Sequence, residues 1–188
     1  TDPRLMLARG CERVFGRAGR AAARAWLTAD RFPFSGYPRW QLNTRWDTVV
    51  SRESLRSWRA EARQCERLAK ARQLPAALQA SLQFRAVLAQ RDLFVRRAGQ
   101  AVLALRHSRA IKPLDALGVE AGQFARVLHA GQVAARTMWR RSRYADRRGP
   151  NELILRVDAV RLRAWRDWVR AARKNPAHVF HASPVCGA

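Results

Sequence analysis

Lysine and acidic residues are both scarce in this chain. Lys70, Lys112 and Lys174 are the only lysines among 37 basic residues, and only 14 Asp and Glu oppose them. The formal net charge is therefore +23 on 188 residues. A free globular protein with this charge is destabilised by its own repulsion, so the excess predicts a polyanion as its standing partner, with nucleic acid the leading candidate.

The preference for arginine over lysine points the same way. A planar guanidinium binds phosphate bidentately and stacks on bases, whereas an ammonium offers a hydrated point charge. A GC-rich genome, which encodes Arg in place of Lys, is the competing explanation for this choice. Codon bias does not create the net charge, so the prediction of a polyanionic partner does not depend on it.

Cysteine is rare and long apolar runs are missing. Cys11, Cys65 and Cys186 stand alone without a CxxC pair, which predicts a reducing compartment and no disulfide. Arginines interrupt every hydrophobic stretch before it reaches the roughly 20 residues of a membrane span. We therefore expect that the chain does not span a membrane.

Motifs for catalysis, nucleotide binding and metal binding are missing too. No phosphate-cradling GxxxxGK[ST] occurs, and Gly16 and Gly19 follow no predicted strand. His178, His181 and Cys186 lack a second pair of ligands, and no nucleophile elbow or paired-carboxylate site is present. We expect no enzyme activity, no catalytic, cofactor or metal site, and no small-molecule substrate.

The chain does contain enough apolar material for a core. Hydrophobic residues make up 48% of it, including seven Trp and seven Phe. This composition predicts a folded domain with arms, in contrast to a disordered basic tail. Four tryptophans crowd the first third, and either packing or base stacking would suit them: Trp26, Trp40, Trp46 and Trp58.

Residues 1–50 are expected to form a basic helix and an extended arm. Ala, Arg and Leu favour helix over 5–29, weakened at its centre by glycines. Two prolines and three aromatics then predict an extended loop over 32–38. Four arginines in the helix recur at spacings of 3 and 4: Arg13, Arg17, Arg20 and Arg24. They predict one cationic face suited to folded RNA, and a matrix-targeting segment is the competing explanation.

Residues 51–110 predict an antiparallel helical hairpin core. Ser51 fits a helix N-cap, and Glu53 in the first turn complements the helix dipole. The first apolar stripe comprises Leu55, Trp58, Ala62, Cys65 and Ala69. After Pro75, the second comprises Leu78, Leu82, Ala86, Ala89 and Leu93. Because neither stripe would be buried alone, the helices should fold back on each other, with the second ending near Arg109.

Residues 111–175 predict a C-terminal helical extension, followed by a tail at 176–188. Pro113 should end the hairpin, with Gly118 in the connection. A third stripe comprises Phe124, Val127, Leu128, Gly131, Ala135 and Met138. The final helix should start near Asn151 and present one apolar face: Leu153, Val157, Val160, Ala164 and Trp168. The predicted fold class is therefore all-α, an antiparallel helical hairpin with additional amphipathic helices and extended basic arms.

Arginines dominate residues 140–148, where Asp146 is the single acid. Trp139 and Tyr144 are interleaved with them, a pattern typical of backbone neutralisation combined with stacking. A solvated, charged helix end is the alternative interpretation. The predicted RNA contacts here are Arg140, Arg141, Arg143, Tyr144, Arg147 and Arg148, and Arg39 and Arg45 complete the predicted set.

Residues 36–98 carry a family pattern. It has a Gly and a Trp before a Ser-x-Glu-x-Leu helix start, then a Trp, a Glu-Arg pair, a turn, and a Val-Leu-x-x-Arg element in a second helix. The residues that match are Gly36, Trp40, Ser51-Arg52-Glu53-Ser54-Leu55, Trp58, Glu66-Arg67, Leu74-Pro75 and Phe84-Arg85-Ala86-Val87-Leu88-Ala89-Gln90-Arg91. In these features the chain resembles the universal large-subunit ribosomal protein number twenty-nine in its mitochondrial form.

The resemblance implies a helical hairpin bound to large-subunit ribosomal RNA near the exit of the nascent-chain tunnel. We therefore expect a structural rRNA-binding protein of the large subunit of the mitochondrial ribosome, located in the matrix. Its partners would be ribosomal RNA and neighbouring ribosomal proteins. The alternative is a basic accessory subunit of an inner-membrane respiratory or ATP-synthase complex, for which a charge of +23 exceeds the need.

Overall fold

The computed structural model describes residues 2–30, 52–108, 111–142, 149–175 and 177. Every regular element among them is helical, which confirms the all-α fold class. The elements are α1 (Pro3–Phe15), the 3-10 turn η1 (Gly16–Ala18), α2 (Gly19–Asp30), α3 (Arg52–Ala69), α4 (Ala76–Ser108), α5 (Lys112–Ser142) and α6 (Pro150–Lys174). The predicted loop at 32–38, the Ser51 cap and the terminal tail lie outside the described residues, except for Ala177.

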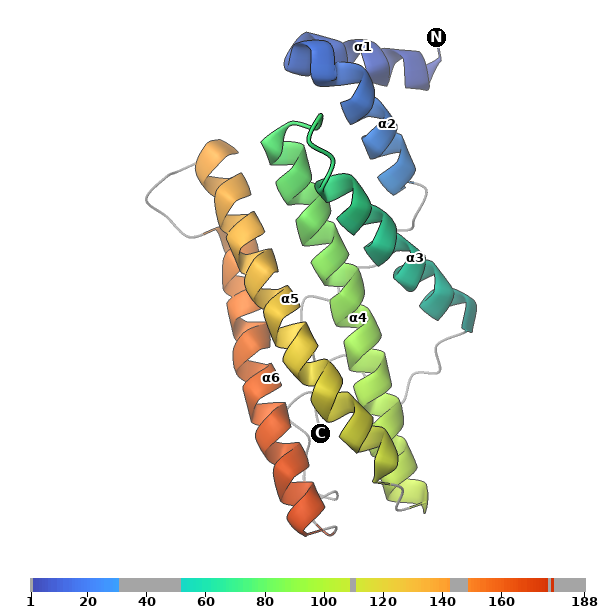
Figure 1. Cartoon of the computed structure of the whole chain (residues 1–188), viewed down its shortest axis with the longest axis vertical. Helices are drawn as coiled ribbons and strands as arrows, with labels where there is room; N and C mark the ends of the chain where they lie inside the picture. Colours follow the sequence, from blue (N-terminus) through green and yellow to red (C-terminus); the bar gives the residue numbers. More distant parts are fainter. Residues whose placement is uncertain (1, 31–51, 109–110, 143–148, 176, 178–188) are drawn as a thin grey trace.

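Helices α4, α5 and α6 lie side by side and share one hydrophobic core (Figure 1). Phe94 of α4 stacks on Phe124 of α5 with ring centroids 4.7 Å apart. The same ring meets Trp165 of α6 edge-on at 5.3 Å. Both geometries suit the aromatic quadrupole, so these rings add directional contacts to the apolar burial.

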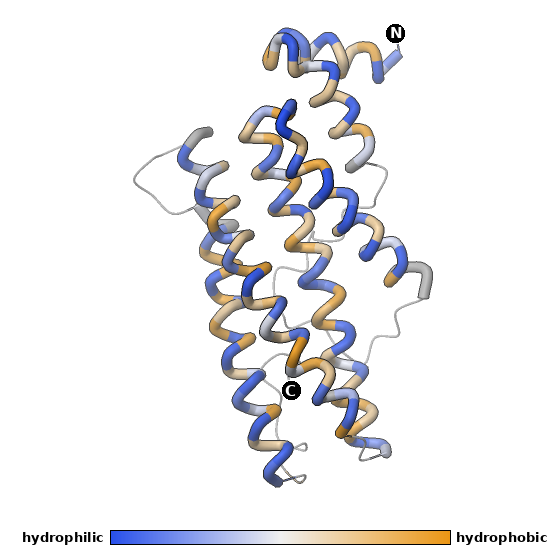
Figure 2. Tube along the Cα trace, viewed as in Figure 1, coloured by the Kyte–Doolittle hydropathy of each residue, from blue (hydrophilic) through white to orange (hydrophobic). Residues whose placement is uncertain are grey.

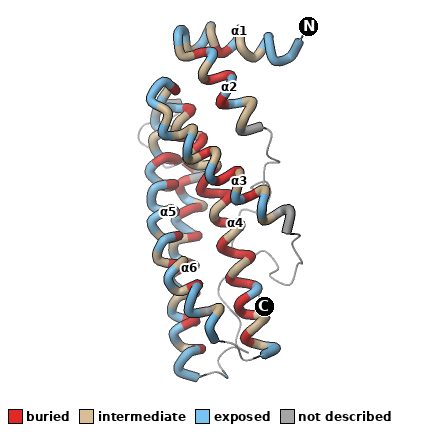
Figure 3. Tube along the Cα trace, turned by 45° about the vertical axis from the view of Figure 1, so that its right-hand side comes forward, coloured by how far each residue is buried: buried red, intermediate tan, exposed pale blue. Residues whose placement is uncertain are grey.

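Helix α4 is the central element because it has neighbours on two sides. It packs against α3 across the turn at 70–75 and against α5 along its other side. Buried residues therefore follow nearly the whole of α4, whereas the other helices alternate between buried and exposed positions (Figure 3). The predicted hairpin segment thus shares its second helix with the C-terminal extension.

The two apolar stripes predicted for α3 and α4 are buried over most of their length. Trp58 is 8% exposed and Cys65 is fully buried, which confirms the predicted inward face of α3. Leu78, Leu82, Ala86 and Ala89 are also buried. Three members at the ends of the stripes, Leu55, Ala69 and Leu93, are only half-buried. Hydrophobic and hydrophilic residues alternate along the helices (Figure 2).

The N-terminal helix expected over 5–29 is two helices joined by a sharp bend (Figure 1). Gly16 ends α1 in the left-handed region with φ +56°, a conformation that favours glycine. A Cβ on Gly19 would lie 2.3 Å from the Cα of Glu12. Only glycine therefore allows α2 to start this close to α1, and Cys11 and Ala22 join the cluster on α3 and α4.

Two boundaries in the C-terminal half differ from the predictions. Gly118 lies inside α5 and not in a connection, because Pro113 falls in the first helical turn, where its missing N–H is not needed. Gly149 is the N-cap of α6, with proline at the first helical position. The helix consequently starts before Asn151, the predicted cap.

The buried face predicted for α6 is wrong. Leu153, Val157 and Val160 are 46%, 49% and 55% exposed, and of the predicted stripe only Trp168 is buried. The residues that face the core are Glu152, Leu155, Asp158, Leu162, Trp165 and Val169. Two of these residues, Glu152 and Asp158, are acidic, so the sequence pattern favoured the other side of the helix as the buried one. The structure buries both acids.

Arginine–carboxylate pairs link the helices that pack together. The pairs between neighbouring helices are Arg20–Glu12, Arg85–Glu61, Arg97–Glu120, Arg91–Asp158, Arg136–Glu152 and Arg173–Asp115. Arg91 of α4 and Asp158 of α6 are each 1% exposed, with 3.4 Å between Nε and Oδ2. Breaking such a buried pair leaves a charge without its counter-ion, which destabilises more than losing an exposed pair does.

Replacing one partner of this buried pair should destabilise the fold strongly. Asp158→Asn leaves Arg91 charged and buried, so we expect a loss of about 3–5 kcal/mol in the free energy of unfolding. Arg91→Met combined with Asp158→Leu should recover most of that loss, because it removes both charges. Urea unfolding followed by circular dichroism measures both variants. A loss below about 1 kcal/mol for Asp158→Asn would mean that the pair is solvated.

Gly131 and Gly122 of α5 provide a matched test of helix packing. A Cβ on Gly131 would lie 2.8 Å from both methyl groups of Val87 and 3.0 Å from Leu155, whereas a Cβ on Gly122 meets nothing within 4 Å. Gly122→Ala should stabilise by about 0.5–1 kcal/mol through helix propensity. Gly131→Ala should destabilise by about 1 kcal/mol net, because overpacking outweighs that gain. Equal unfolding midpoints for the two variants would contradict the close approach of α4 and α5.

Candidate nucleic-acid interface

The fold buries acidic side chains more often than basic ones. Among the acidic residues whose side chains the structure describes, four are buried: Glu61, Asp92, Glu152 and Asp158. Among the described basic residues, only Arg91 and Arg96 are buried. The described surface therefore loses more negative than positive charge on folding, which strengthens the attraction to a polyanion.

A row of arginines runs along the outer face of α3. The row consists of Arg56, Arg59, Arg63 and Arg67. Spacings of 3, 4 and 4 place them on one face of an uninterrupted helix, and all of them are exposed. Within the described ranges, no carboxylate forms an ion pair with any of the four. We call these residues the α3 arginine row.

The buried face of α3 fixes this row toward solvent. Trp58 and Cys65 anchor the opposite face, and burial raises the pKa of the Cys65 thiol to about 11. Glu61 on the same helix does not neutralise the row, because its side chain is buried and accepts a hydrogen bond from Arg85 Nε of α4 at 2.6 Å. The packing that orders α3 also removes a carboxylate from its cationic surface.

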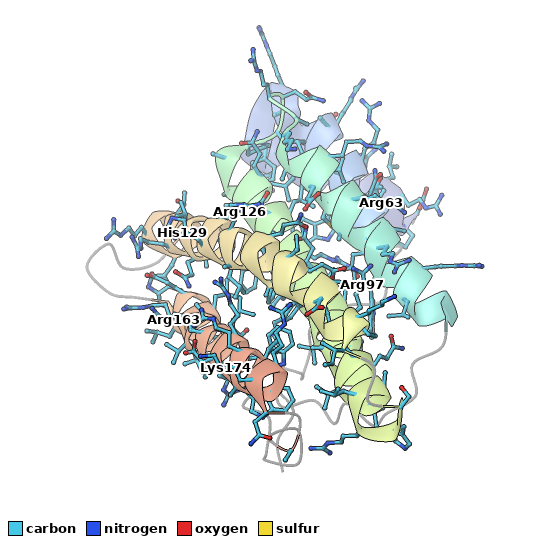
Figure 4. The ribbon with its side chains drawn as sticks, turned by 60° about the horizontal axis from the view of Figure 1, so that its bottom comes forward. Arg63, Arg97, Arg126, His129, Arg163 and Lys174 are labelled. Atoms are coloured by element: carbon cyan, nitrogen blue, oxygen red, sulfur yellow. The ribbon has the colours of Figure 1, made fainter. Side chains whose placement is uncertain are left out.

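The geometry of the row suits a phosphate backbone. Neighbouring members lie about 5–6 Å apart at Cβ, and the row spans about 16 Å along the helix. Lys70 and Arg72, both exposed in the following turn, continue the positive surface. Such contacts neutralise phosphates and position a protein without reading base sequence. Figure 4 shows Arg63 of the row on α3, apart from Arg126 of α5 and Arg163 of α6.

The N-terminal arginines do not form the single helical face that was predicted. All four are exposed: Arg13, Arg17, Arg20 and Arg24. The bend at Gly16 distributes them over α1, η1 and α2. Arg20 Nε donates to Glu12 at 2.7 Å, and this bond raises the pKa of the guanidinium. One of the four predicted cations is therefore already paired within the protein.

The segment at 140–148 is described only at its start. Arg140 is exposed at the end of α5. Trp139 is half-buried, and its indole packs against the start of α6, because a Cβ on Gly149 would lie 2.7 Å from the ring. The other predicted contacts lie outside the described side chains: Arg39, Arg45, Arg141, Arg143, Tyr144, Arg147 and Arg148.

The α3 arginine row was missed in the sequence although its signal was present. The apolar stripe at 55–69 identified the helix, and the arginines obey the same periodicity on the opposite side. The basic run at 140–148 is more conspicuous in the sequence, because its arginines are close to one another along the chain. Spacing, which decides whether cations share a helix face, is the better criterion in a helical protein.

No protein-family model, curated protein or solved structure matches this chain. None of the described helices combines the length and the apolar character that a bilayer crossing requires. In the same residues, His, Cys, Asp and Glu side chains do not gather in groups of three or more that would hold a metal ion.

Proposed function

We propose that this protein binds structured RNA through the α3 arginine row, as a non-enzymatic structural component of the large subunit of a mitochondrial ribosome. The observation that carries the RNA-binding role is an ordered row of four exposed arginines without acidic partners among the described residues. Self-repulsion within such a row is relieved when phosphates replace water around it. RNA is thus the polyanion that fits an extended, one-sided cationic helix.

The ribosomal part of the proposal rests on the resemblance over residues 36–98. That stretch includes all of α3 and the first two thirds of α4, so the row lies within the segment that carries the family pattern. In that family the corresponding hairpin binds large-subunit ribosomal RNA. The matrix location follows from the same resemblance and from the basic N-terminal segment.

Removing the row should weaken RNA binding and its dependence on salt. With Arg56, Arg59, Arg63 and Arg67 all replaced by Gln, the slope of log affinity against log salt should fall by up to about four units. Titration of the purified full chain with a structured RNA at several salt concentrations measures the slope. Folding should persist, because exposed substitutions usually cost within about 0.5 kcal/mol each.

The matched control replaces the N-terminal set Arg13, Arg17, Arg20 and Arg24 by Gln, with the same loss of charge. Its slope should change less, because Arg20 is paired with Glu12 and the set is spread over a bend. If both variants lose the same slope, binding follows total charge and the row has no special role. An unchanged salt-dependence slope in the α3 variant would show that the α3 arginine row is not part of the RNA interface.

Particle membership distinguishes the ribosome from the membrane-complex alternative. We expect the native protein to co-sediment with a large ribonucleoprotein particle and to be released by RNase treatment, because its surface charge is balanced by phosphate. Quantitative immunoblotting across a sucrose gradient, with and without RNase, measures this. Migration that depends on detergent and not on RNase would favour the accessory subunit of an inner-membrane complex.

A further inference from the structure

The outer face of α6 carries an aliphatic stripe that nothing among the described residues covers. Leu153, Val157 and Val160 are each about half exposed, at 46%, 49% and 55%, and Ala164 is also exposed. Spacings of 4, 3 and 4 align these four residues on one side of the helix. We call them the α6 aliphatic stripe. The core needs none of them, because α6 packs on its opposite face through Leu155, Leu162 and Trp165.

A basic groove borders this stripe. Arg156, Arg163 and Arg166 of α6 line a groove of about 400 Å³ against α5, where Ala125 and Gln132 form the opposite wall. None of the described residues that line the groove is acidic. Within the described parts of the chain, none of the three arginines has a carboxylate partner. Figure 4 shows Arg163 on α6 and Arg126 on the neighbouring α5.

Val160 belongs to both features, since it is part of the stripe and lines the groove. The surface therefore offers aliphatic side chains in one row and guanidinium groups directly beside it. A helix packed here would place apolar residues on the stripe at i, i+3, i+4 and i+7. Its flanking positions would face the arginines, so carboxylates there would find partners.

Other occupants fit this surface less well. An RNA backbone would pair with the arginines but leave the aliphatic side chains against hydrated phosphate. A second copy of the chain brings a further +23 charge, which opposes association. Residues 31–51 and 176–188 of the same chain contain a single acid, Asp47, and so supply one negative charge for three arginines.

From the stripe and the groove together, we propose that α6 is the docking surface for an acidic amphipathic helix of a neighbouring protein. The stripe supplies apolar contact area, and the three arginines select partners with carboxylates on one flank. This surface is separate from the α3 arginine row and does not depend on it. The protein would thus contact RNA through one helix and a protein partner through another.

A designed peptide tests the proposal on the full-length protein. The probe is a fluorescein-labelled helix of about five turns with leucines at i, i+3, i+4 and i+7 and glutamates on one flank. A scrambled peptide of the same composition controls for charge alone, because a protein with a net charge of +23 attracts any acidic peptide. Fluorescence anisotropy should show at least about tenfold tighter binding of the patterned peptide.

Variants then separate the stripe from the groove. Val157→Ser combined with Val160→Ser should weaken the patterned peptide about tenfold, and Arg156→Gln combined with Arg163→Gln should lower the salt dependence of binding. The matched control is Val133→Ser on α5, a valine of similar exposure at 49% outside the groove lining, which should change affinity less than about twofold. Circular dichroism confirms that each variant is folded.

Three results would overturn the proposal. The first is equal binding of patterned and scrambled peptides. The second is an unchanged affinity in the stripe variant. The third is a stripe variant that still binds the peptide but no longer binds phosphatidylglycerol vesicles or RNA. Loss of vesicle binding would assign this face to lipid, and loss of RNA binding would assign it to nucleic acid. Loss of RNA binding in the α3 variants leaves the α6 docking surface unaffected, so the two functions fail separately.

Discussion

The pairing of a carboxylate on one helix with an arginine on the next is the interaction on which this bundle depends. Glu61, Asp158 and Glu152 are buried, and the structure neutralises them with Arg85, Arg91 and Arg136 respectively. Each of these pairs joins two different helices, so the helices are held in register as well as in contact. Apolar burial alone is non-directional, whereas an ion pair between two helices is satisfied in only one alignment. The chain has few acids, yet four of those that the structure describes are buried.

That use of acids has a direct effect on the surface. Burial of Glu61 removes a carboxylate from the surface of α3, where the exposed arginines have no ion-pair partner among the described residues. Its inward face combines Trp58, Cys65 and Glu61, and its outward face carries the four arginines of the row. The stability of the fold and the protein's affinity for anions are thus connected. The orientation of α3 that buries Glu61 also exposes the α3 arginine row. The proposed RNA-binding role follows from this arrangement more than from the total number of arginines.

Sequence periodicity predicted α3 and α4 well, because the apolar residues of each helix recur on the side that the structure buries, although Glu61 and Arg91 are buried beside them. It failed on α6, where Glu152 and Asp158 lie on the buried side and three aliphatic residues lie outside. No local pattern reveals that an acid will be neutralised by an arginine some 67 positions away in sequence, as Arg91 is from Asp158. The bend at Gly16 was hidden for a different reason: composition favours helix on both sides of it, and only the backbone shows the positive φ. The α3 arginine row could have been predicted with the same periodicity rule that identified the apolar stripe of this helix.

The position of α4 between α3 on one side and α5 and α6 on the other has a consequence for biosynthesis. Chains emerge from the ribosome N-terminus first, so α3 and α4 are made before α5 and α6. Until α6 is made, Arg91 of α4 lacks its ion-pair partner Asp158, and Phe94 lacks the edge-on contact with Trp165. The shared core closes only when the last helix arrives. A chain that terminates before α6 therefore leaves the core between α4 and α5 open on one side, and its Arg91 forms no ion pair with Asp158.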